Sequence, residues 1–152
     1  MISPRVLLLG SLTVLLPGLA ALSAQPQEKR ALTVWDGVYS QAQATRGADV
    51  YEEHCALCHA PDLSGDTPYN PSPQLAGRAF LLRWEGKHLD ELYTRICATM
   101  PQNKPGTLKP EQCADVMAFV FKRNQFPAGD AQLPADVEAL GNVAITLQGA
   151  KK

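Results

Sequence analysis

Apolar residues recur at helical spacing in four segments of this chain, and irregular stretches separate them. The first segment predicts a helix from about Gln41 to Ala56, and the second predicts a short helix from Leu75 to Trp84. The third, from Leu89 to Cys97, has two acidic residues in its first turn, where the helix dipole favours them. The fourth begins at Pro110, a good first-turn residue, and ends before Pro127. The pattern predicts an all-α protein with three main helices and a short one.

Two loops interrupt this helical pattern. Residues 60–73 hold four prolines and one glycine, and residues 99–108 hold Pro101, Pro105 and Gly106. A patternless stretch as long as 60–73 is uncommon in a compact domain unless it has a function. We therefore expect this loop to wrap the edge of a cofactor.

The first 24 residues have the pattern of a secretory signal peptide. A weakly positive start containing Arg5 precedes an apolar run from Val6 to Leu16, and small residues follow up to Ala24. An uncleaved anchor helix is the alternative, but the apolar run is short and Pro17 interrupts it. We expect cleavage after Ser23 or Ala24 on export to the periplasm. The remaining chain divides into an N-terminal extension (25–40), a helical domain (41–127) and a C-terminal tail (128–152).

The charge is nearly balanced, with 14 basic and 15 acidic residues. Removing residues 1–24 takes away Arg5 and no acidic residue, which leaves a net charge of −2. Neither sign dominates, which argues against nucleic acid or an anionic membrane as the main partner. Protein partners are therefore expected, with no stable membrane anchor.

Five consecutive residues, Cys55 to His59, form a C-x-x-C-H sequence, which is the attachment signature of c-type haem. In this chemistry two thiols add to the porphyrin vinyl groups, and the histidine supplies an imidazole to one face of the iron. A zinc site is the alternative, and it would need two further ligands, such as Cys97 and Cys113. Export and the helix pattern favour one covalent haem c, held by Cys55 and Cys58, with His59 as iron ligand.

A second iron ligand is expected at Met100, in the proline-rich loop. A thioether raises the reduction potential of haem iron, which suits electron transfer. Met117 is a rival, but it lies on the apolar stripe of a helix and is better explained as core. His88 begins a helix and is expected in solvent, and His54 is expected on the surface, directed away from the iron.

The remaining cysteines, Cys97 and Cys113, enclose the loop that contains Met100. In an oxidising compartment a disulfide between them is favoured over two buried thiols. A bridge closing a loop of this length would stabilise the fold by on the order of 3 kcal/mol.

Several apolar contacts are expected around the cofactor. Gly47 and Tyr51 on the first helix should meet Phe119 or Val120 on the last, because the glycine allows the two backbones to approach closely. Three further side chains are expected to line the haem edge and keep water from the iron: Leu75, Phe80 and Trp84.

With these features the chain resembles class I c-type cytochromes over about residues 41–127. Four segments carry the resemblance: Gly47–His59, Leu75–Trp84, Leu89–Pro101 and Ala114–Val120. It implies a cytochrome c fold around one covalent haem, in which the backbone carbonyl of Pro73 or Pro71 orients His59. The WDGVY segment (35–39) and the FPAG segment (126–129) are similar to those of small cytochromes that accompany periplasmic quinoprotein dehydrogenases. The Cys97 and Cys113 pair departs from the simplest pattern of the family.

The sequence thus favours a periplasmic single-haem electron carrier rather than an enzyme. It would take one electron from a dehydrogenase or a membrane complex and pass it to an oxidase or another cytochrome. One alternative is a haem subunit held permanently in an oxidoreductase complex, with the extension and the tail as its interface. Another is a sensor or enzyme with an open sixth position, which requires that Met100 not ligate the iron.

Overall fold

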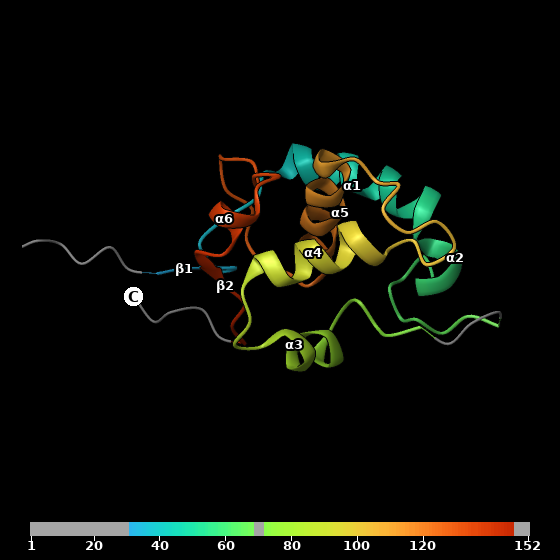
Figure 1. Cartoon of the computed structure of the whole chain (residues 1–152). Helices are drawn as coiled ribbons and strands as arrows, with labels where there is room; N and C mark the ends of the chain where they lie inside the picture. The colour runs from blue at the N-terminus through green and yellow to red at the C-terminus, as the bar shows by residue number, and fades with distance from the viewer. Residues whose placement is uncertain (1–30, 69–71, 148–152) are drawn as a thin grey trace, which may run out of the picture.

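The computed structural model describes residues 31–68 and 72–147. Within them the regular secondary structure is helical apart from two short strands, which confirms the predicted all-α class. Helices α1, α4 and α5 form the centre, α3 lies below them, and α2 and α6 lie at opposite ends (Figure 1). The bounds are α1 Gln41–His54, α2 Ala56–His59, α3 Arg78–Trp84, α4 Leu89–Thr99, α5 Pro110–Arg123 and α6 Val137–Leu140, with strands β1 Leu32–Thr33 and β2 Val143–Ala144. None of these helices is long and apolar enough to cross a membrane.

The contact between α1 and α5 is the most extensive one between helices of the described residues, and Gly47 lets the two backbones approach closely. A Cβ atom at this position would overlap the backbone carbonyl of Asp115 and would lie 3.0 Å from the Cβ of Phe119. One turn further on, the rings of Tyr51 and Phe119 pack with their centroids 5.0 Å apart. The predicted meeting of Gly47 and Tyr51 with Phe119 is therefore confirmed.

An ion pair between the exposed Arg46 and the buried Asp115 joins the same two helices. Asp115 is only 7% exposed. Arg46 donates to both of its carboxylate oxygens, from Nε at 2.9 Å and from Nη2 at 2.7 Å. This two-point geometry fixes how the helices are rotated against each other as well as how far apart they lie.

Two helix boundaries differ from the prediction. The first helix was expected to continue to Ala56, but α1 ends at His54 because Cys55 leaves the helical conformation (φ −125°). The short helix was expected from Leu75, but α3 begins only at Arg78, after Gly77 at φ +75°. A glycine adopts that conformation without strain, so it turns the chain into the helix.

The segments on either side of the helical core pack against it, although the sequence pattern suggested an extension and a tail. Strands β1 and β2 pair in parallel, with Leu32 opposite Val143. Gln43 of α1 holds the C-terminal segment through two hydrogen bonds: its Nε2 donates to the carbonyl of Leu133 (3.0 Å), and its Oε1 accepts from the backbone N–H of Leu133 (2.8 Å). Leu140 and Ile145 are fully buried. These segments therefore form the end of the molecule where α6 lies (Figure 1).

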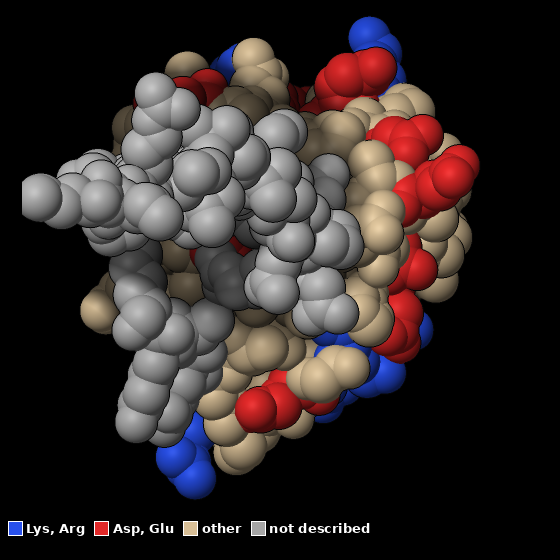
Figure 2. Space-filling model, turned by 90° about the vertical axis from the view of Figure 1, so that its left-hand side faces the viewer, with Lys and Arg blue, Asp and Glu red and all other residues tan. Residues whose placement is uncertain are grey.

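Charges on the described part of this end are mixed in sign. Figure 2 shows this face with acidic side chains along one border and a smaller number of basic ones above and below. This distribution agrees with the nearly balanced charge of the sequence.

Candidate cofactor site

A cavity of about 590 Å³ lies between α4, α2 and the loop that leads into α3. This volume is typical of a cofactor or small-molecule site. Much of the wall is apolar, with contributions from Leu75, Phe80, Leu92, Ile96, Val116 and Val120. All four residues singled out from the sequence also line it: Cys55, Cys58, His59 and Met100.

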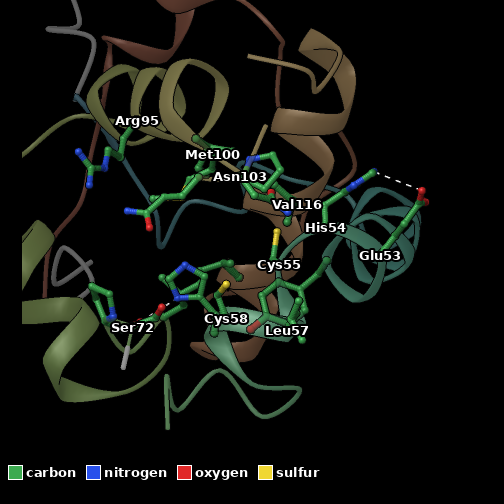
Figure 3. A pocket seen from close by; sticks show the side chains of 18 of the residues that line it. Glu53, His54, Cys55, Leu57, Cys58, Ser72, Arg95, Met100, Asn103 and Val116 are labelled. Carbon is green, nitrogen blue, oxygen red and sulfur yellow. Dashed lines mark hydrogen bonds and ion pairs between the residues drawn. The ribbon is translucent and has the colours of Figure 1, made fainter. Parts of the chain in front are cut away.

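The two thiols reach the cavity from different elements. Cys55 follows the end of α1 and Cys58 belongs to α2, yet both sulfurs point into the same space (Figure 3). The two thiols do not lie on one continuous helix, because the chain leaves the helical conformation at Cys55. Burial, and then the neighbouring Cys58, raise the pKa of the Cys55 thiol to about 11. The free thiol of Cys55 is therefore protonated at neutral pH. Because both sulfurs lie in the same cavity, the two cysteines can attach to one edge of a flat ligand.

The geometry around His59 leaves one ring nitrogen free to bind iron. The imidazole is buried, and Nδ1 lies 3.0 Å from the carbonyl oxygen of Pro73. A carbonyl only accepts, so Nδ1 carries the proton and Nε2 keeps its lone pair. Burial lowers the pKa of His59, and the bond to Pro73 opposes this only partly, which favours the neutral, ligating form. Of the two proline carbonyls considered, that of Pro73 makes the bond; Pro71 lies outside the described residues.

Met100 reaches the cavity from the α4 side. It directly follows α4, and its backbone N–H donates to the carbonyl of Ile96 at 3.1 Å. This hydrogen bond holds the backbone of Met100 against the last turn of α4. Figure 3 shows Met100 and Cys58 on facing walls of the cavity. A flat group attached to the thiols would therefore have Met100 over one face.

The other candidate ligands lie elsewhere or serve other purposes. Met117 is fully buried in the core and His88 is exposed, both as predicted. His54 is partly exposed and lies at the cavity rim, where its Nε2 is 3.6 Å from a carboxylate oxygen of Glu53 (Figure 3). Trp84 differs from the prediction, since it does not line the cavity but packs beside Phe80, with ring centroids 6.5 Å apart.

The loop that carries Met100 is closed at its base by Cys97 and Cys113. Their sulfurs are in contact and their Cα atoms lie 5.7 Å apart, within the range that a disulfide requires. Neither cysteine lines the cavity. Between 31 and 147, leaving out 69–71, no group of three or more His, Cys, Asp or Glu side chains is placed to hold a metal ion. Cys97 and Cys113 contact each other away from the cavity, so they are not placed as the two further ligands of a zinc site at Cys55 and Cys58.

The hydrogen bonds by which Tyr51 and Asn124 hold the cavity wall were not predicted from the sequence. The hydroxyl of Tyr51 donates to the carbonyl of Ala60 at 2.6 Å, directly after His59. Asn124 accepts from the N–H of Gly77 and donates to the carbonyl of Leu75, both at 2.9 Å. No spacing rule links Asn124 to residues nearly fifty positions earlier, whereas a tyrosine rather than a phenylalanine on the buried stripe of α1 was a usable signal.

We expect Tyr51→Phe to reduce stability by about 0.5–1.5 kcal/mol, because the carbonyl of Ala60 would lose one of its two donors and keep only the backbone N–H of Leu63. It should also shift the reduction potential of the haem protein, since Ala60 follows the proposed iron ligand His59. Chemical unfolding and a redox titration measure the two effects.

Tyr39→Phe is the matched control for Tyr51→Phe. The hydroxyl of Tyr39 donates to the carbonyl of Phe126 at 2.8 Å, and Tyr39 does not line the cavity. It should lose at least as much stability as Tyr51→Phe and keep its potential. Equal potentials in the two variants would show that Tyr51 acts on stability alone.

The fold and the cavity define a class of protein, a small all-α domain that carries a single c-type haem. Over residues 42–120, just over half of its length, the chain matches the family described as cytochrome c oxidase, cbb3-type, subunit III, and it belongs to that family. The domain is therefore an electron-transfer haem domain that binds haem c covalently. No match was found among curated proteins or among solved structures.

Proposed function

We propose that this protein is an exported single-electron carrier in which His59 and Met100 are the axial ligands of the iron. The observation that carries the proposal is the arrangement of the cavity, with two thiols on its wall, a neutral imidazole with a free Nε2, and a thioether facing them from α4. A site with both iron faces taken has no open position for a substrate, which favours a carrier over a haem enzyme.

The chain's own residues supply attachment, orientation and exclusion of water. Cys55 and Cys58 hold the haem covalently, and Pro73 keeps the His59 ring in the ligating tautomer. The apolar wall, including the fully buried Phe80, keeps water away and helps set the potential. When bound, the haem supplies the one-electron chemistry between ferrous and ferric iron.

A redox-titrated visible spectrum of the purified protein tests this function. We expect a c-type haem spectrum, a single one-electron transition, and in the oxidised form the weak band that reports a methionine–iron bond. A spectrum without that band, together with binding of a small exogenous ligand, would favour a sensor or enzyme with an open sixth position.

A fixed haem subunit is the second candidate function, and the family description favours it, because it names a subunit of an oxidase. The structure narrows where such an interface could lie, since Leu133, Leu140 and Ile145 of the C-terminal segment are already buried within the domain. A stable partner that copurifies with the full-length protein at moderate salt would support a subunit, whereas a free monomer would support a shuttle.

Export also predicts the covalent state of the mature chain. The proposed signal peptide, residues 1–24, lies outside the described residues, and we propose that it is removed in the periplasm. The intact mass of the denatured protein should then match a chain beginning near Gln25, plus one haem, minus the two hydrogens lost when Cys97 and Cys113 join. Alkylation before reduction should label neither cysteine.

The proposed bridge should also matter for stability. Cys97→Ser combined with Cys113→Ser should destabilise the protein by on the order of 3 kcal/mol. Two reactive thiols in the native protein would disprove the bridge without touching the haem assignment.

A further inference from the structure

Three basic side chains line the cavity without making an ion pair. They are Arg83 on α3, Arg95 on α4 and Lys104 in the loop after Met100. All three are exposed, and in the part of the chain that the structure describes their side chains make no hydrogen bond or salt bridge. By contrast, Arg46 is paired with Asp115, at 2.7 Å. The cavity thus presents unused positive charge.

The position of Arg95 indicates which edge of the haem it would contact. Figure 3 shows it at the end of the cavity away from Cys55 and Cys58. A porphyrin of this type carries its vinyl groups on one edge and its two propionates on the opposite edge. Because the thiols fix the vinyl edge, the propionate edge is directed toward the end where Arg95 lies.

Arg83 approaches from the other wall. Helix α3, which carries it, lies across from α4 in Figure 1, and both arginines line the same cavity. Two cations on opposite walls match two carboxylates on one edge of a flat ligand. Arginine suits this task, because its planar guanidinium can donate two parallel hydrogen bonds to a carboxylate.

We propose that Arg95, with Arg83 on the facing wall, binds the haem propionates. The inference rests on the covalent haem of the proposed function and adds the residues that recognise its anionic edge. Carboxylates brought to the mouth of an apolar cavity need such partners to offset their loss of water. A positive charge near the haem also favours the ferrous state, so Arg95 raises the reduction potential as well as anchoring the cofactor edge.

The test compares Arg95→Gln with Arg78→Gln in the intact haem protein. Arg78 is exposed on α3 and does not line the cavity, so its replacement removes the same charge away from the proposed site. Two readouts are used: the reduction potential, and the infrared bands of the haem carboxylates in oxidised-minus-reduced difference spectra. Arg95→Gln should lower the potential and shift the carboxylate bands, while Arg78→Gln should leave both unchanged.

A charge-conserving variant separates hydrogen bonding from charge. Arg95→Lys should keep most of the potential but still shift the carboxylate bands, because an ammonium cannot make the two-point contact. If Arg95→Gln does not yield haem protein, Arg95→Lys and Arg83→Gln decide the matter by the same bands.

Identical potentials and bands in the Arg95 and Arg78 variants would overturn the proposal, and the cavity cations would then be solvent-facing charges. The visible spectrum keeps this failure distinct from failure of the proposed function. A variant with a normal c-type spectrum and a methionine–iron band has an intact haem and intact ligands, whether or not its propionates contact an arginine.

Discussion

Met100→Ala should lower the reduction potential by on the order of 100 mV, within the roughly 0.8 V range over which axial ligands tune haem. The methionine–iron band should disappear from the oxidised spectrum. The haem itself should stay attached, because Cys55 and Cys58 hold it covalently. Met117, the other methionine in the described part of the chain, is buried in α5 and does not line the cavity, so it is not placed to replace Met100.

Met117→Ala is the matched control for this experiment. Met117 is fully buried among core side chains and does not line the cavity. Its truncation should cost about 2–5 kcal/mol of stability and leave the methionine–iron band in place. If instead Met117→Ala removed the band and Met100→Ala kept it, the ligand assignment would be wrong.

Much of the fold could be predicted because its signals are local. The apolar stripes gave the main helices, and Pro110 marked the start of α5 correctly. The C-x-x-C-H sequence placed Cys55, Cys58 and His59 together without knowledge of any distant contact, because all of its chemistry lies within five residues. Met100 also lines the cavity as expected, although its role as a ligand stays a proposal.

The differences arise where the tertiary structure overrides the local pattern. The apolar stripe of α1 continues through Cys55, yet the chain leaves the helix there, so Cys55 and Cys58 reach the cavity from different elements. A helical wheel cannot show this, since the alternative conformation depends on packing around α2. Likewise the C-terminal segment has only a weak pattern of its own, and Gln43, ninety positions away from Leu133, supplies its backbone partners.

Gly47→Ala should destabilise the protein by about 2–4 kcal/mol, more than most single substitutions. The added methyl group would meet the backbone carbonyl of Asp115, and a backbone cannot move aside as a flexible side chain can. Helices α1 and α5 would have to separate, which would stretch both hydrogen bonds between Arg46 and Asp115. Chemical unfolding of the oxidised haem protein, followed by far-ultraviolet circular dichroism, measures the loss.

Gly141→Ala separates this close contact from the general effect of replacing a glycine. Gly141 has helical angles (φ −62°), and an added Cβ would meet its nearest atoms at 3.5 Å or more. This variant should be unchanged or stabilised by less than about 1 kcal/mol, because alanine reduces the entropy of the unfolded chain. If Gly47→Ala behaved in the same way, there would be space for a methyl group between α1 and α5. Close packing of these helices would then not be what holds the cavity wall in place. A large loss confined to Gly47 would instead tie the stability of the haem site to this one helix crossing, since Tyr51 lies one turn further along α1 and Cys55 follows the end of that helix.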